Sequence, residues 1–172
     1  IMANDIGVIN SHFSYHSSLK KDFSKWINYN YGPLLLMNLL FVPWSKPLGL
    51  YQQHLPSSLK VSTYEEVWEK EHEILHATSL RKKRNNFMDV NQWLFKEWQI
   101  MKGDFSPRNR HFGKYIMIST IEDVKNLHSA ISNKKVKVVC INDHVKNDFK
   151  QIVDNVKIEL ESILGTKSSF EM

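Results

Sequence analysis

The chain has almost no cysteine, and Cys140 is the only one among its 172 residues. A single cysteine excludes a disulfide framework within the chain and fits a reducing compartment. The sequence also lacks a long apolar run. The longest, residues 33–44, is interrupted by Asn38 and is shorter than the roughly 20 apolar residues that a membrane-spanning helix needs. No secretory signal pattern is visible either, so a cytoplasmic location is expected.

Several common catalytic motifs are missing as well. The sequence has no Walker loop, no GxGxxG and no GxSxG, and its eight histidines show no HExxH spacing. These absences remove the support for common nucleotide-cofactor, serine-hydrolase and zinc-site interpretations. The chain also begins with Ile1 instead of Met, so we expect either a processed or trimmed chain or a piece of a longer one.

The composition is that of a folded globular protein, with 42% apolar, 24% charged and 12% aromatic residues, five of them Trp. The length suits one domain, and no internal repeat or interdomain linker is visible. The formal net charge is +5, and its densest basic stretch is residues 81–84 (RKKR). Such a run is typical of a solvated face, and the alternative is a binding surface for phosphate groups.

The spacing of apolar residues predicts a mostly helical α/β fold with a small buried sheet. Two β-branched runs, residues 115–119 and 136–141, are predicted strands, and the second is apolar enough to be buried on both faces. Ser62 and Glu65 predict a capping box at a helix start, and Gly103 predicts a helix end. Residues 43–56 contain too many prolines and glycines for regular structure, and are therefore a predicted loop.

Two places in this pattern carry side chains suited to catalysis. His54 lies in the predicted loop, where an imidazole can take a proton from a hydroxyl, although a loop histidine can equally be inert. Asn142 and Asp143 follow the second strand, and active sites of α/β sheets gather at such strand ends. The alternative is that one of them caps the next helix. Cys140, inside the strand, is interpreted as a buried apolar residue and not as a nucleophile.

Several motifs occur in an order that resembles the Stealth family of sugar-phosphate transferases. The third conserved block of that family resembles residues 54–56 (HLP), 64–68 (YEEVW), 89–95 (DVNQWLF), 98–99 (WQ) and Gly103. The fourth block resembles residues 112–115 (FGKY), 140–143 (CIND) and 167–171 (KSSFE). The resemblance divides a single unit, 1–172, into a helical linker region (1–53), the third block (54–110) and the fourth block (111–172). It implies the C-terminal part of a larger Rossmann-like, glycosyltransferase-type catalytic domain.

The resemblance also implies a reaction. Stealth proteins transfer a sugar 1-phosphate from a nucleotide-diphosphate sugar to a hydroxyl, and the bacterial members build capsular or exopolysaccharide. The expected partners are therefore a nucleotide-sugar donor and a growing polysaccharide acceptor, with Mg²⁺ as cofactor and without nucleic acid. The expected location is the cytoplasm, with peripheral association at the inner face of the bacterial inner membrane as a variant of it.

Carried over residue by residue, the family's catalytic positions fall on His54 as general base, Arg84 as the neutraliser of phosphate charge, and Asp143. The resemblance implies that Asn142 and Asp143 orient the donor or the metal. Four residues are expected to bind substrate: Asn142, Arg81, Gln92 and Lys114. The spacing before Asp89 is one residue longer than the family's, which puts Asn85 in the slot of Arg84 when counted backwards and leaves Arg81 as an alternative.

The family's first and second blocks, which carry its acidic donor-site residues, are not among these 172 residues. Asp143 alone offers too few ligands for Mg²⁺, so we expect a missing N-terminal half to supply further carboxylates. We also expect that half to cover apolar surface of this chain. A different class of function stays open beside this one, namely a non-catalytic basic module that binds nucleic acid or a polyanionic polysaccharide through residues 81–84. A degenerate scaffold fragment is a third alternative.

Overall fold

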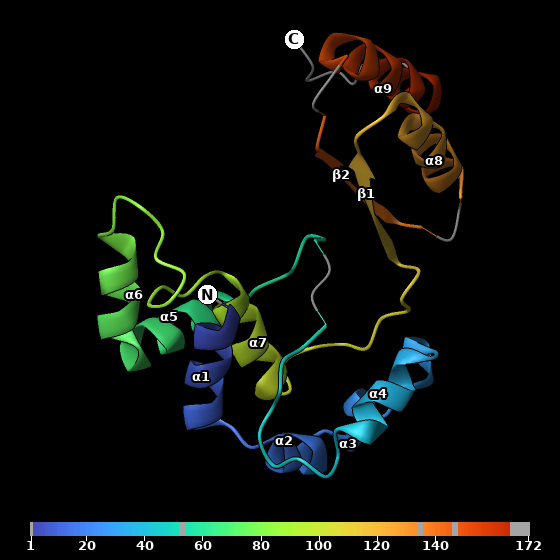
Figure 1. Cartoon of the computed structure of the whole chain (residues 1–172). Helices are drawn as coiled ribbons and strands as arrows, with labels where there is room; N and C mark the ends of the chain where they lie inside the picture. Colours follow the sequence, from blue (N-terminus) through green and yellow to red (C-terminus); the bar gives the residue numbers. More distant parts are fainter. Residues whose placement is uncertain (1, 52–53, 134–135, 146–147, 166–172) are drawn as a thin grey trace. The chain divides into compact units, whose positions relative to one another are not determined.

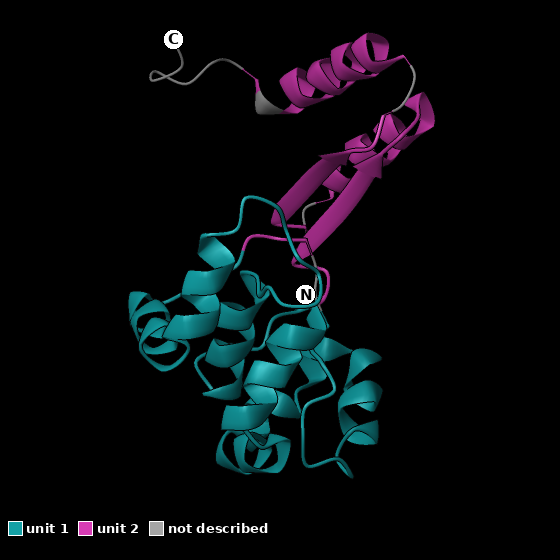
Figure 2. Cartoon of the chain, turned by 60° about the vertical axis from the view of Figure 1, so that its left-hand side comes forward, with its two compact units in different colours: residues 1–52, 57–109 teal, residues 53–56, 110–172 magenta. Residues whose placement is uncertain are grey.

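The computed structural model describes residues 2–51, 54–133, 136–145 and 148–165. By its internal contacts the chain divides into two compact units, shown in Figure 2. Unit 1 comprises Ile1–Gln52 and Ser57–Asn109, and unit 2 comprises Gln53–Pro56 and Arg110–Met172. The loop segment that carries His54 therefore belongs to unit 2. The single domain with divisions after residues 53 and 110 stays a prediction.

Unit 1 is helical (Figure 1). Its helices are α1 (Met2–His12), α2 (Tyr15–Lys21), α3 (Phe23–Trp26), the 3₁₀ helix η1 (Tyr29–Tyr31), α4 (Leu34–Leu40), α5 (Val61–Lys70), α6 (His72–Ser79) and α7 (Trp93–Met101). The predicted capping box is wrong: α5 begins at Val61 with Lys60 at its N-cap and without a side-chain cap bond, so Ser62 already lies inside the first turn.

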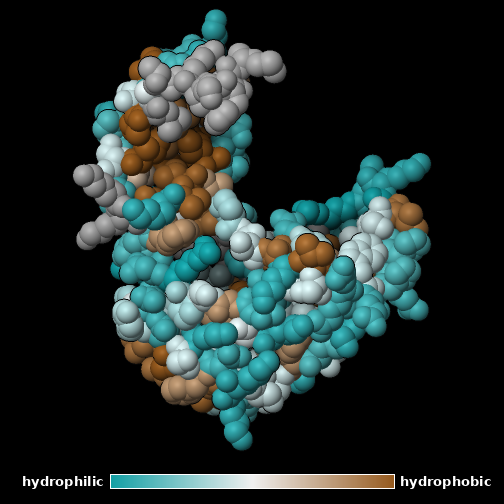
Figure 3. Space-filling model, turned by 180° about the vertical axis from the view of Figure 1, so that it is seen from behind, coloured by the Kyte–Doolittle hydropathy of each residue, from teal (hydrophilic) through white to brown (hydrophobic). Residues whose placement is uncertain are grey.

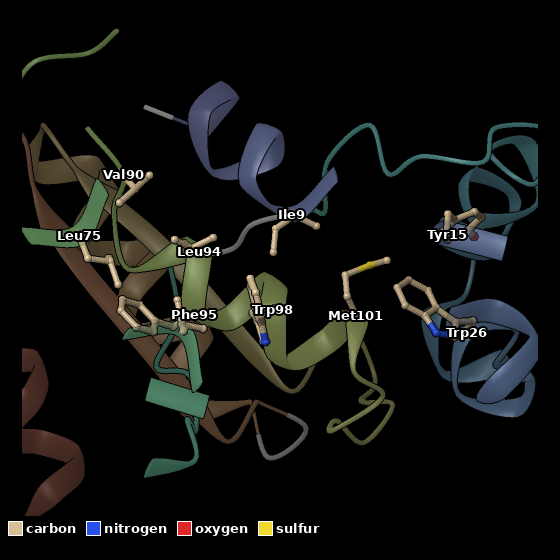
Figure 4. Packing of buried hydrophobic residues seen from close by; sticks show 10 residues of the cluster. Ile9, Tyr15, Trp26, Leu75, Val90, Leu94, Phe95, Trp98 and Met101 are labelled. Carbon is tan, nitrogen blue, oxygen red and sulfur yellow. The ribbon is translucent and has the colours of Figure 1, made fainter. Parts of the chain in front are cut away.

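The core of unit 1 is built around α7, which packs on α1 and α5. Figure 4 shows Trp98 of α7 beside Ile9, with Met101 between Trp98 and Trp26. Trp98 is only 1% exposed, and the ring of Phe13 meets it edge-on at a centroid distance of 5.0 Å. Buried aromatic pairs of this kind add to the stability that their buried area already provides. Four aromatic residues are buried in this core: Tyr15, Trp26, Phe95 and Trp98.

The chain leaves α7 through Gly103, whose φ of +85° confirms the predicted left-handed helix end. Its carbonyl oxygen accepts a hydrogen bond of 2.5 Å from Lys25 Nζ, and the same ammonium pairs with Asp22 at 3.1 Å. A Cβ at position 103 would lie 2.7 Å from Asp22 Cγ and closer still to Asp22 Oδ2. Gly103 is therefore required both for its backbone conformation and for the close approach of the Asp22 carboxylate.

We expect Gly103→Ala to lower the free energy of unfolding by about 2 kcal/mol, because it adds left-handed strain and displaces Asp22 from Lys25. Urea unfolding followed by circular dichroism measures this difference. Gly7→Ala is the matched control, since nothing lies within 4 Å of a Cβ at that position of α1. The control should be neutral or more stable by up to about 1 kcal/mol. Equal stability of Gly103→Ala and wild type would contradict the role of Gly103.

Unit 2 holds β1 (Gly113–Ile118), α8 (Ile121–Ser132), β2 (Val138–Asp143) and α9 (Phe149–Leu164). The two strands pair in parallel, with α8 as the crossover between them, and in the described residues they form a two-stranded sheet. The predicted mostly helical α/β fold with a small sheet is confirmed. The start of α8 is fixed by Asp123, whose carboxylate accepts hydrogen bonds from the backbone N–H groups of Ser119 and Thr120 at 3.0 and 2.9 Å. These bonds lower the pKa of Asp123.

The two faces of the sheet differ. On one face Ile116 and Ile118 are buried against α8 and α9 through four core residues: Val124, Leu127, Ala130 and Ile152. Side chains alternate along a strand, so the other face carries Tyr115 and Met117 of β1 opposite Cys140 and Asn142 of β2. Within the part of the chain that the structure describes, no helix of unit 2 packs on this second face.

The second strand is suited to burial on both faces, but the described chain leaves one face uncovered, which fits the expectation that apolar surface of this chain needs cover from a further segment. β2 is half-buried over its first three residues and exposed over Ile141, Asn142 and Asp143. Apolar side chains gather on the surface of unit 2 in Figure 3, and exposed ones include Met117 (47%), Ile141, Phe149, Val153 and Ile158 (61%). Parallel sheets are usually covered on both faces, which makes this surface unusual for a complete fold. None of the helices in the described ranges is both long and apolar enough to cross a membrane.

Candidate functional site

The exposed face of the sheet in unit 2 carries the candidate site, and a glycine lets the loop reach it. Gly113, at the start of β1, has no side chain, and a Cβ there would lie 3.1 Å from Leu55 Cδ2 and closer still to Leu55 Cδ1. Leu55 therefore occupies the space over the strand, and the neighbouring His54 follows it onto the same face. The imidazole ring of His54 lies 5.2 Å from the ring centroid of Tyr115, with an angle of 39° between the ring planes.

Asn142 approaches the same tyrosine from the neighbouring strand. Its Nδ2 donates a hydrogen bond of 2.9 Å to the hydroxyl oxygen of Tyr115. Residue 142 stands two positions beyond the direct partner of Tyr115, so the two side chains share one face of the sheet diagonally. Tyr115 thus contacts both His54 and Asn142. His54 and Asn142 were predicted separately as site residues, and both contact Tyr115, for which the sequence predicted no role in the site.

The structure also tests the interpretation of Asn142 and Asp143 as helix caps. β2 continues through Asp143, and the N-cap of α9 is Asp148, which has a φ of +56°. Neither Asn142 nor Asp143 caps the helix, so the capping alternative is wrong. Helix capping therefore does not explain why two polar residues end this strand, whereas Asn142 has its partner in Tyr115. Cys140 is half-buried on the same face, in register with Tyr115.

The other predicted site residues of unit 2 are exposed but do not share this face. Asp143 pairs in register with Ile118 and Lys114 with Val139, which places both on the side of the sheet that the helices cover. Asp143 nevertheless stands at the carboxyl end of β2, the end where ligands of α/β sheets bind. The structure therefore brings His54 and Asn142 together at Tyr115, and the roles of all four predicted site residues of unit 2 stay predictions.

The remaining predicted site residues, Arg81, Arg84 and Gln92, belong to unit 1. Arg81 Nη1 lies 3.1 Å from Asp89 Oδ1, and the two side chains are 27% and 5% exposed. This contact is an ion pair without hydrogen-bond geometry. The second carboxylate oxygen of Asp89 accepts a 2.6 Å bond from the backbone N–H of Asn85. Arg84 and Gln92 are exposed.

A divalent metal would need several oxygen ligands from this chain or its partners. Among residues 2–51, 54–133, 136–145 and 148–165, no group of three or more histidine, cysteine, aspartate or glutamate side chains is arranged to hold a metal ion. Asp143 offers one carboxylate at the end of β2. The expected Mg²⁺ therefore stays a prediction, and these residues by themselves do not form its site.

Several curated bacterial proteins match nearly the whole chain. It is 39% identical over 172 residues to a capsular polysaccharide phosphotransferase, WcwK, of Streptococcus pneumoniae. It is 32% identical over 171 residues to the receptor polysaccharide phosphotransferase WefC of Streptococcus gordonii, and 28% identical over 171 residues to the exopolysaccharide phosphotransferase cps2G of Lactiplantibacillus plantarum. These matches cover 98% to 99% of the chain but 50% of each relative, so the chain spans about half the length of these proteins. No family model matches the chain. No solved structure matches it.

Proposed function

We propose that the chain forms part of a sugar-1-phosphate transferase. The premise is that it belongs with the bacterial polysaccharide phosphotransferases, over the half of their length that it spans. The donor is a nucleotide-diphosphate sugar, and the acceptor is a hydroxyl of a growing capsular or exopolysaccharide. The resemblance to the Stealth family implies the same reaction. One structural observation supports the proposal most: His54 and Asn142, far apart in the sequence, meet at Tyr115 on an exposed sheet face.

In this proposal His54 is the general base. Its imidazole takes the proton of the acceptor hydroxyl while the hydroxyl oxygen forms a bond to the phosphorus that carries the sugar. The bond between that phosphorus and the oxygen bridging to the nucleoside monophosphate breaks, and the monophosphate leaves with the electron pair. The products are a phosphodiester, a nucleoside monophosphate and a protonated His54. An exposed imidazole at a sheet face is accessible to such an acceptor.

Asn142 and Arg84 are proposed to hold the donor. An asparagine amide has two N–H hydrogens and a carbonyl oxygen, so one bond to Tyr115 leaves groups of Asn142 available for a phosphate or sugar oxygen. A guanidinium neutralises charge on the transferring phosphoryl group, and the exposed Arg84 suits this role. Gln92 and Lys114, also exposed, are proposed to contact substrate.

The half of the relatives that this chain does not span is part of the proposal. Mg²⁺ usually binds through one or two carboxylates together with substrate phosphates. This chain contributes one candidate ligand, Asp143, so the other ligands would come from that missing half. A cytoplasmic location, with peripheral association at the inner face of the membrane, also belongs to the proposal and would keep Cys140 reduced.

The proposed activity is tested on the intact protein with a panel of nucleotide sugars, Mg²⁺ and polysaccharide acceptor, by measuring the release of nucleoside monophosphate. Release that depends on both donor and acceptor supports the proposal, and its absence across the panel contradicts it.

The alternative of a basic binding module rests on residues 81–84. It is weakened because Arg81 is already paired with the buried Asp89.

The two arginines should respond differently to substitution. We expect Arg84→Ala to lower turnover at least about tenfold, because it removes charge next to the transferring phosphate. Arg81→Ala should have the smaller effect on turnover but lower the free energy of unfolding by about 2 kcal/mol, since it leaves the buried Asp89 without its cation. Lys83→Ala, from the same basic run, controls for net charge. The reverse order of turnover for Arg81 and Arg84 would contradict this assignment.

A further inference from the structure

Tyr115 is the residue of the site with no role assigned so far. We propose that Tyr115 is a positioning residue, which holds the imidazole of His54 with its ring and the amide of Asn142 with its hydroxyl. The inference rests on the proposed function, because it adds a residue to that site. Tyr115 need not touch the substrate, and its effect on transfer would pass through the two side chains that it contacts.

Tyr115 is itself firmly anchored. It lies in the middle of β1, directly before Ile116, which is 6% exposed and belongs to the core of unit 2. Its backbone is paired in parallel with Cys140 of β2. Residues on paired strands hold functional groups more precisely than residues on loops. The ring of Tyr115, itself half-buried, is therefore a fixed surface against which a loop residue can be placed.

The two partners of Tyr115 lie in less constrained positions. His54 lies in a segment without helix or strand, attached to β1 through Leu55 over Gly113. Asn142 is exposed near the end of β2. A side chain in either setting has several rotamers open to it, and each rotamer lost on binding or catalysis costs free energy. One tyrosine that contacts both side chains reduces this freedom in both and sets their mutual position.

The two contacts use different parts of the phenol, so they can be removed separately. The aromatic ring faces the imidazole at 5.2 Å, within the distance range of favourable ring pairs. The hydroxyl oxygen accepts the 2.9 Å hydrogen bond from Asn142 Nδ2. Tyr115→Phe removes only the second contact, and Tyr115→Leu removes both while keeping an apolar side chain on the strand.

We expect Tyr115→Phe in the intact enzyme to raise the KM for the nucleotide sugar about threefold to tenfold with a smaller change in kcat, because only Asn142 loses its partner. Tyr115→Leu should in addition lower kcat at least about tenfold, because the ring that orients the imidazole of His54 is lost. Asn142→Ala combined with Tyr115→Phe should be no worse than Asn142→Ala alone, which is the sign of one shared contact. Tyr29→Phe, at a tyrosine that is 86% exposed in unit 1, is the matched control and should behave as wild type.

A readout without activity separates this inference from the proposed function. In intact protein with isotope-labelled histidine, the imidazole protons of His54 are assigned by their loss in His54→Ala. Their NMR resonances should move in Tyr115→Leu, which lacks the ring current, and stay close to wild type in Tyr115→Phe. Unchanged His54 resonances in a folded Tyr115→Leu, or additive effects of Tyr115→Phe and Asn142→Ala, would overturn the inference.

If Tyr115→Leu does not fold, the additivity of Tyr115→Phe and Asn142→Ala decides. Absence of transfer by wild type would contradict the proposed function, and the resonances would still decide whether Tyr115 positions His54.

Discussion

Replacing His54 by alanine in the intact protein is expected to lower turnover at least about a hundredfold and to leave the fold unchanged. A general base contributes about 10²-fold to 10⁴-fold to a rate, and its loss removes the acceptor of the hydroxyl proton. The fold should persist because His54 is exposed on a loop and outside both apolar cores. Initial rates of nucleoside monophosphate release, together with far-ultraviolet circular dichroism, measure both effects.

His76→Ala is a suitable control, because His76 is an exposed histidine on α6 of unit 1, where its ring stacks on His72. It should keep wild-type turnover. Added imidazole should restore part of the rate to His54→Ala but not to Arg84→Ala, since only the first variant lacks a base. A general base is expected to contribute at least about a hundredfold to the rate. Turnover of His54→Ala within about threefold of wild type would therefore exclude His54 from that role.

The 172-residue chain by itself is expected to fold but to transfer no sugar phosphate. Folding is expected because each unit has its own buried apolar cluster, around Trp98 in unit 1 and around Leu127 in unit 2. Inactivity is expected because the described residues form no acidic cluster for Mg²⁺ and the chain spans half the length of its relatives. The exposed apolar residues of β1, β2 and α9 should make the isolated chain self-associate or bind the missing half.

Light scattering of the purified chain over a range of concentrations measures self-association, and the transfer assay is run on the same samples. The separately produced remaining half of the protein is then added. We expect that this addition lowers self-association of the chain and restores part of the transfer rate. A chain that stays monomeric at high concentration, or one that transfers sugar phosphate at the rate of the intact protein, would contradict a site shared between the two halves.

Much of the fold could be predicted because it depends on local sequence. The helix end at Gly103 follows from a backbone conformation that glycine adopts without strain, and the structure has it at φ +85°. The capping pair Thr120 and Asp123 marks the start of α8 in the same way. Local signals failed where an element begins or ends a few residues from its expected position. The helix α5 begins at Val61, so Ser62 is not its cap. The strand β2 extends through Asp143, so Asn142 is not a cap either.

The candidate site could be predicted only in part, because its contacts join distant segments. Apolar spacing indicates a strand around Tyr115, but neither its register with β2 nor the loop on its open face follows from local pattern. The contacts of Tyr115 with His54 and Asn142 depend on both. The apolar run of β2 correctly indicated a strand that is suited to burial. The same run also indicated that this chain would leave apolar surface uncovered, but which face of the sheet is open depends on the placement of other segments.

The most direct test of the proposed site is ³¹P NMR of reactions catalysed by the intact protein, its His54→Ala variant and its Asn142→Ala variant, each with the same nucleotide sugar, Mg²⁺ and acceptor polysaccharide. The wild-type reaction should lose the donor's diphosphate resonances and gain one phosphodiester and one nucleoside monophosphate resonance in equal amounts. Both variants should form these products far more slowly, His54→Ala at least about a hundredfold. Wild type that releases free sugar and intact nucleoside diphosphate, or variants that form the phosphodiester at the wild-type rate, would contradict the assignment of this site to sugar-phosphate transfer.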